Sequence, residues 1–141
     1  MEAKDLMIGD WVQVPSLIDN VEQYDAWCTV RQLRDCDLDV VGFKELKYDE
    51  IVPIPLTPEI LEKNGFVANK HVYPYPYYEY ENEKGKLKIG FAFPQGNKTS
   101  YKEPWVCIDS EYVFIEHIPC IYVHQLQHTL RLCGIEKEII L

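Results

Sequence analysis

The sequence predicts a mixed α+β protein, in which a small N-terminal β-barrel or bent sheet packs with a C-terminal antiparallel sheet and one main helix. Short runs of alternating apolar and polar residues, typical of strands, fill residues 1–55. Helix start and stop signals follow, and apolar residues recur at helical spacing near the C-terminus. We therefore expect a β-rich subdomain over 1–55 and an α+β subdomain over 56–141, with helices near 58–64 and 121–133.

The N-terminal subdomain is expected to consist of short extended segments. A Gly-Asp turn precedes the alternating residues of the first, and an Asp-Cys-Asp break separates the second from the third. The first segment, 6–14, contains this turn and the strand that follows it, and the others cover 26–33, 38–43 and 47–54. Pro53 and Pro55 are expected to end strand pairing, because proline has no amide hydrogen to donate.

The short helix near 58–64 is predicted by its two ends. Thr57 can cap the helix with its hydroxyl, and Pro58 fits the first helical position. Glu59 lies near the positive end of the helix dipole. Gly65 can adopt the left-handed conformation that closes the last turn, and Phe66 can then fold back onto the helix.

The C-terminal subdomain is expected to combine strands with the main helix. The strands are predicted over 77–82, 87–93, 105–108 and 112–118. Prolines in the segment 72–81, VYPYPYYEYE, favour an edge position in the sheet. The helix near 121–133 carries an apolar stripe and ends at Gly134, and the segment 136–141 is expected to dock because it ends in Ile-Ile-Leu.

Composition indicates a folded globular protein, since 47% of the residues are hydrophobic. No apolar run approaches the roughly 20 residues of a membrane-spanning helix. The N-terminus MEAKDLMIGDW lacks the pattern of a secretory signal, so we expect a cytoplasmic location and no membrane partner. The five cysteines are an odd set without a C-x-x-C pair, which favours buried thiols over a disulfide framework.

The net charge of −9 disfavours binding to a phosphate backbone. The only local basic stripe, at Lys84, Lys86 and Lys88, follows glutamates at the same alternating spacing. Such a pattern is typical of a hairpin with opposite charges across its strands. We expect no nucleic-acid partner, a monomer or weak homo-oligomer, and possible complementarity to a basic protein. A nucleic-acid mimic would need regularly spaced carboxylates, and the lysine stripe argues against it.

Tyrosine is concentrated in one segment, where it can form a partner surface because it offers a large contact area with a polar tip. The candidate partner-binding residues are Tyr73, Tyr75, Tyr77, Tyr78 and Tyr80. Their parity would place aromatic rings on both faces of a strand, so ordinary packing is the alternative.

No residue set specifies catalysis, a metal site or a cofactor. His124 and His128 lie four residues apart, a spacing that also serves zinc ligands, but there is no H-E-x-x-H pattern. The pair is expected on a solvated polar face, away from the apolar stripe. His117 and Cys120 complete the candidate set for a small metal-dependent or cysteine hydrolase. The apolar neighbours of Cys120 favour an inert thiol.

Two resemblances extend this interpretation. The segment LMIGDWVQV resembles the first strand of SH3-like barrels. Together, GDWV, PIPLTPEIL and YVHQLQ resemble blocks of a family of small uncharacterised proteins of the Bacteroides group, associated with phages or other mobile elements. The family resemblance spans most of the chain and implies no activity or catalytic residue. We expect a non-enzymatic protein-interaction module, with the small hydrolase as the alternative.

Overall fold

The structure is a computed structural model that describes residues 3–15, 26–69, 77–83, 85–90, 105–110 and 114–141. Its internal contacts divide the chain into two compact units, Met1–Ile54 and Pro55–Leu141. We call them unit 1 and unit 2 and describe each by itself. Antiparallel sheets occur in both units, and the main helix belongs to unit 2, so the predicted α+β class is confirmed.

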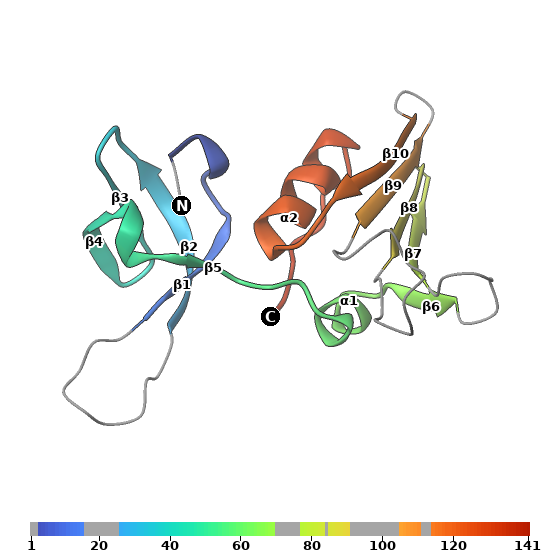
Figure 1. The fold of residues 1–141 in the computed structure, drawn as a ribbon, viewed down its shortest axis with the longest axis horizontal. Helices are drawn as coiled ribbons and strands as arrows, with labels where there is room; N and C mark the ends of the chain where they lie inside the picture. Colours follow the sequence, from blue (N-terminus) through green and yellow to red (C-terminus); the bar gives the residue numbers. More distant parts are fainter. Residues whose placement is uncertain (1–2, 16–25, 70–76, 84, 91–104, 111–113) are drawn as a thin grey trace, which may run out of the picture. The chain divides into compact units, whose positions relative to one another are not determined.

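Unit 1 is an antiparallel sheet with the strand order β4-β3-β2-β1-β5 (Figure 1). Its elements are η1 (Ala3–Asp5), β1 (Trp11–Val14), β2 (Ala26–Leu33), β3 (Asp37–Val40), β4 (Phe43–Lys47), η2 (Tyr48–Glu50) and β5 (Val52–Pro53). Strand β2 is shared between two neighbours, because its first half pairs with β1 and its second half pairs with β3. Register shifts in the β2–β3 and β3–β4 ladders mark irregularities that increase local bending and twist.

One face of this sheet supplies the core of unit 1. Buried side chains of β1, β2 and β3 join two residues from outside the strands in one cluster: Leu6, Val12, Val14, Cys28, Val30, Leu38, Val40 and Ile51. A single sheet can bury one face in this way by curving over it. The pairings of the described residues leave β4 and β5 at opposite edges, so the sheet is open and does not close into the barrel that was the other expectation.

Two predicted strands of unit 1 have the wrong bounds. The strand expected over 38–43 is interrupted by a turn at Val41–Gly42, where Gly42 adopts a φ of +93° that side-chain-bearing residues rarely tolerate. The segment 47–54 contains the turn η2 and the short strand β5. Pro53 does not end pairing but lies opposite Val12, which is possible because β5 is an edge strand.

Unit 2 contains a second antiparallel sheet, with the order β10-β9-β8-β7-β6. Its elements are α1 (Pro58–Lys63), β6 (Val67–Asn69), β7 (Tyr77–Asn82), β8 (Gly85–Gly90), β9 (Trp105–Ser110), β10 (Phe114–Pro119) and α2 (Val123–Leu132). Figure 1 shows α2 on one side of this sheet. Strand β6 was not predicted. The edge position expected for the tyrosine segment 72–81 is wrong for its described part, while residues 72–76 lie outside the described residues. Strand β7 pairs on both sides because Pro74 and Pro76 precede it and leave its own amides able to donate.

The ends of α1 confirm the signals seen in the sequence. The hydroxyl of Thr57 accepts a hydrogen bond from the amide of Ile60 at 3.4 Å. The pKa of Glu59 is lowered by its own backbone amide and by the Thr57 hydroxyl. Gly65 has a φ of +82°, and the amide of Phe66 donates to the Leu61 carbonyl at 3.0 Å, which closes the last turn.

The segment after α2 docks on α1, as expected; we call residues 135–141 the C-terminal tail. Ile135 and Ile139 are buried. The Asn64 side chain donates to the Ile140 carbonyl and accepts from the Ile140 amide, at 2.7 and 2.8 Å. Lys63 donates to the carbonyl of Leu141. The tail is therefore part of the folded body of unit 2.

Candidate functional site

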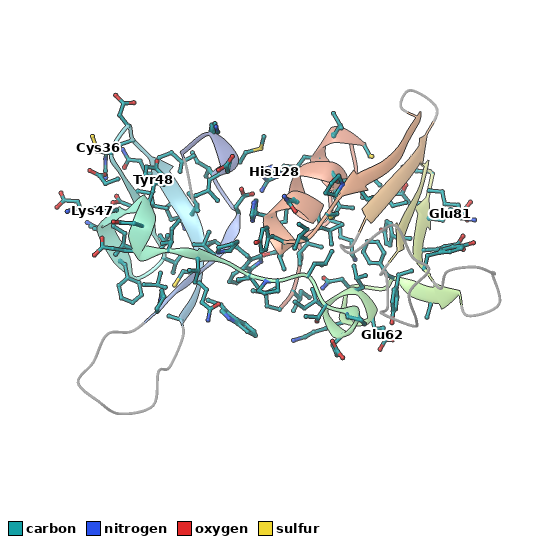
Figure 2. The ribbon with its side chains drawn as sticks, in the orientation of Figure 1. Cys36, Lys47, Tyr48, Glu62, Glu81 and His128 are labelled. Atoms are coloured by element: carbon teal, nitrogen blue, oxygen red, sulfur yellow. The ribbon has the colours of Figure 1, made fainter. Side chains whose placement is uncertain are left out.

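The histidine candidates lie on α2 and do not form the solvated face that we expected. His124 is only 5% exposed, and Gln127 is also buried. The His124 ring stacks on Tyr122, with centroids 5.7 Å apart and an interplanar angle of 10°. His128, labelled in Figure 2, meets the edge of His124 at 5.7 Å. The prediction fails because the surroundings of α2 bury a wider arc than the apolar stripe alone.

The remaining hydrolase candidates add no reactive group that the structure describes. Cys120 is 1% exposed, and burial raises the pKa of its thiol to about 12. A thiol with this pKa is protonated at neutral pH and is a poor nucleophile. His117 lies in β10, but its side chain is outside the described part of the structure. Among the described residues, no three histidine, cysteine or acidic side chains gather as metal ligands.

The tyrosine candidates fall on different sides of β7. The hydroxyl of Tyr78 donates to Glu62 of α1 at 3.2 Å, and partial burial together with that carboxylate raises the pKa of Tyr78. Tyr80 packs against Phe66 and lies beneath the ammonium group of Lys137. These two half-buried rings are therefore engaged with other elements of unit 2. Tyr77 has the opposite parity, and Tyr73 and Tyr75 lie outside the described residues.

The other side of the β7–β8 hairpin carries the alternating charges that the sequence predicts. Lys86 Nζ lies 3.2 Å from Glu79 Oε1 and 3.8 Å from Glu81 Oε2, and the bond to Glu79 raises the pKa of Lys86. Figure 2 shows Glu81 on the hairpin, well separated from Glu62 on α1. The acidic side chains of this hairpin are therefore partly neutralised within the unit.

Most of the negative charge of the chain belongs to unit 1. Its sequence holds 12 acidic and 5 basic side chains, a net −7, whereas unit 2 holds 11 and 9, a net −2. One of the five cations is already engaged: Arg34 pairs with Asp37 and, at 2.8 Å, with Asp39. These carboxylates raise the pKa of Arg34. Because Arg34 is paired within the unit, its positive charge is shared between two of the acidic side chains of unit 1.

A row of three large apolar side chains and one glutamine crosses the outer face of the unit 1 sheet, on the side opposite the core. Trp27 and Val52 both lie opposite Gln13 in the register, so the three side chains share one face of β2, β1 and β5. Trp27 is 52% exposed and Val52 is 39% exposed. Trp11 is half-buried and occupies the same face, diagonal to Trp27. We call Trp11, Gln13, Trp27 and Val52 the outer row.

The outer row was missed by sequence reasoning. The alternation of Trp27 with Cys28 and Val30 already assigned the tryptophan to the side of Thr29 and Arg31. That parity is a usable signal for an outward-facing tryptophan. Its alignment with Val52 depends on the pairing of β1 with β5, which brings together segments almost forty residues apart and has no local signature.

Comparisons of the chain with models of known families, with curated proteins and with solved structures found no match. The family resemblance and the likeness of the first strand to that of SH3-like barrels therefore stay predictions, while the sheet formed by the described residues of unit 1 is open. In the part of the chain that the structure describes, neither helix is long and apolar enough to cross a membrane.

Proposed function

We propose that this chain is a non-enzymatic interaction module that binds a basic protein through the outer row of unit 1. The observation that carries this proposal is the coincidence of exposed tryptophan with a strongly acidic unit. Tryptophan is enriched among the residues that contribute most to binding at protein interfaces. A net charge of −7 would attract and orient a cationic partner.

The geometry of the outer row supports this assignment over the tyrosine segment. The rings of Tyr78 and Tyr80 are engaged with α1 and the C-terminal tail, whereas Trp27 projects from the outer face of its sheet. Trp27 and Val52 lie on either side of Gln13 in one cross-strand row, so the surface offers apolar contact area together with a side-chain amide that can form hydrogen bonds. A partner with an apolar residue flanked by lysines or arginines would match both the row and the surrounding charge.

No specific observation on the described residues favours a hydrolase. The described candidates are a buried thiol with a raised pKa and two histidines that contact each other on one helix. The sequence resemblance implied that the protein is encoded by a phage or other mobile element. We include this origin in the proposal, so the partner is sought in a host cell.

The proposal is tested by capture from a host lysate with the wild type, Trp27→Ala and Val67→Ala. Val67 is 70% exposed on unit 2, so its variant controls for the loss of an exposed apolar side chain elsewhere. We expect the wild type and Val67→Ala to capture the same basic protein, and Trp27→Ala to lose it. Binding of the purified partner should weaken by at least about tenfold in Trp27→Ala and decline with added salt.

Two results would contradict the proposal. One is an identical set of captured proteins for all three chains. The other is a purified partner that is acidic or whose affinity does not respond to salt. Circular dichroism should show the same fold for every variant, because replacement of an exposed side chain changes stability by about 0.5 kcal/mol or less.

A further inference from the structure

The dipeptide Asn64-Gly65 lies where α1 ends and the C-terminal tail docks. Asn64 is 3% exposed, and both ends of its side-chain amide are engaged. Its Nδ2 donates to the carbonyls of Ile60 and Ile140, each at 2.7 Å, and its Oδ1 accepts from the Ile140 amide. One side-chain amide thus joins the last turn of α1 to the tail, which begins seventy-one residues later in the chain.

An Asn-Gly dipeptide is also the sequence in which asparagine deamidates most readily, because glycine leaves the following backbone nitrogen unhindered. That nitrogen attacks Cγ of asparagine, a nitrogen–carbon bond forms, and the carbon–Nδ2 bond breaks. Nδ2 leaves as ammonia and carries away the amide proton. Water then opens the resulting succinimide at either carbonyl and yields aspartate or isoaspartate.

The folded structure opposes each part of this reaction at Asn64. The attacking nitrogen, that of Gly65, donates its proton to the carbonyl of Glu62 at 3.1 Å. The leaving Nδ2 is held by two carbonyl oxygens, and burial limits access of water. Reaction therefore requires that the tail and the last turn of α1 open together.

We propose that Asn64 is a deamidation site that docking of the C-terminal tail protects, and that its conversion releases the tail irreversibly. Both products lose the Nδ2 donor. In isoaspartate the main chain runs through Cγ, so the side-chain amide no longer exists, and in aspartate an oxygen stands where Nδ2 stood, facing the carbonyl oxygens of Ile60 and Ile140. In the aspartate form the change acts directly on the two hydrogen bonds. Two donated hydrogen bonds become repulsive contacts between acceptors, one of them charged. Opening of the tail thus exposes the site, and modification prevents the tail from docking again. This inference does not depend on the proposed binding surface of unit 1.

The first experiment measures deamidation of the full chain at mildly alkaline pH by peptide mapping that separates asparagine, aspartate and isoaspartate. We expect the rate at Asn64 to be at least about tenfold lower in the folded protein than in denaturant. Ile140→Pro removes the amide that Asn64 accepts from and should raise the folded-state rate several-fold. Ile140→Ala keeps that amide and truncates an exposed side chain, so it should behave like the wild type.

The second experiment uses Asn64→Asp as a mimic of the product, with Asn82→Asp as a control for the added charge. Hydrogen exchange over residues 135–141 should accelerate at least about tenfold in Asn64→Asp and stay unchanged in Asn82→Asp. Equal deamidation rates in folded and unfolded wild type would overturn the protection. A protected tail in Asn64→Asp would overturn the release, and this readout holds even if Ile140→Pro fails to fold.

Discussion

Unit 1 and unit 2 each bury one side of an antiparallel sheet, yet they cover it differently. In unit 2, α2, the C-terminal tail and α1 supply buried side chains, and polar groups such as Asn64 and His124 are taken into the interior. Among the described residues of unit 1, the covering is done by the curved sheet itself with Leu6 and Ile51. The side chains on the outer face of that sheet therefore do not belong to the core of unit 1.

The two units also differ in how they handle charge. Unit 2 is close to neutral, and its hairpin places Lys86 beside Glu79 and Glu81. Unit 1 has more than twice as many acids as bases and still uses Arg34 internally. Among its described residues, unit 1 combines exposed Trp27 and Val52 on one sheet face with a net charge of −7 over its sequence. This combination favours the proposed binding surface.

Thiol reactivity should separate the units most strongly. Cys36 of unit 1 is exposed, whereas burial raises the pKa of Cys120 in unit 2 to about 12. At neutral pH the thiol of Cys120 is therefore ionised far less than that of an ordinary cysteine. We expect iodoacetamide to modify Cys36 first and Cys120 last among Cys28, Cys36, Cys120 and Cys133, as read by mass spectrometry. Early labelling of Cys120 in folded protein would show that the interior of unit 2 is open.

Core truncations should be equally costly in the two units if the curved sheet of unit 1 packs as well as the helix-covered sheet of unit 2. Leu38 and Leu126 are both fully buried. Leu38→Ala and Leu126→Ala are each expected to lower the free energy of unfolding by about 2–5 kcal/mol. Urea unfolding with hydrogen exchange in the affected unit measures this. A cost below about 1 kcal/mol for Leu38→Ala would indicate a loosely packed unit 1.

Asp10 is the unit 1 counterpart of Asn64, a buried polar side chain that ties local backbone. Its Oδ2 accepts from the Met7 amide at 2.7 Å, while its carbonyl accepts from the amide of Val30. Asp10→Ala should destabilise the protein by about 1–3 kcal/mol, because the Met7 amide loses its acceptor. Asp10→Asn keeps an oxygen at this position and should cost less. Equal urea midpoints for wild type and Asp10→Ala would show that the Asp10 side chain does not stabilise the fold.

Acid sensitivity is the smallest expected difference. The backbone amide of Glu45 and the Arg34 guanidinium lower the pKa of Asp39. A carboxyl whose pKa is lower in the folded than in the unfolded chain stabilises the protein above about pH 4, and this contribution is lost as the pH falls through the folded value. Asp39→Asn should therefore flatten the acid side of the stability profile of unit 1. Carboxylates titrate between roughly pH 5 and 2. If the free energy of unfolding changes with pH equally in wild type and Asp39→Asn over this range, solvent screens the interaction of Asp39 with Arg34.

Several elements could be predicted because their causes lie within a few residues. The cap of α1 needs only Thr57, Pro58 and Gly65, and the predicted span of β2 follows from alternation over Ala26–Leu33. The opposed charges of the hairpin follow from spacing around its turn. Errors begin where a turn was hidden in an extended run, as at Gly42, or where a short strand such as β6 has too little pattern to be seen.

The sequence by itself determined the α+β class, the capped helix α1, the apolar stripe of α2 and the acidic character of the chain, since each depends on local periodicity, capping or composition. Only the tertiary structure decided that His124 is buried, that Asn64 holds the tail and that Trp27 shares an outer row with Val52. Burial and cross-strand alignment arise when segments distant in sequence meet, and no local pattern encodes which segments those will be.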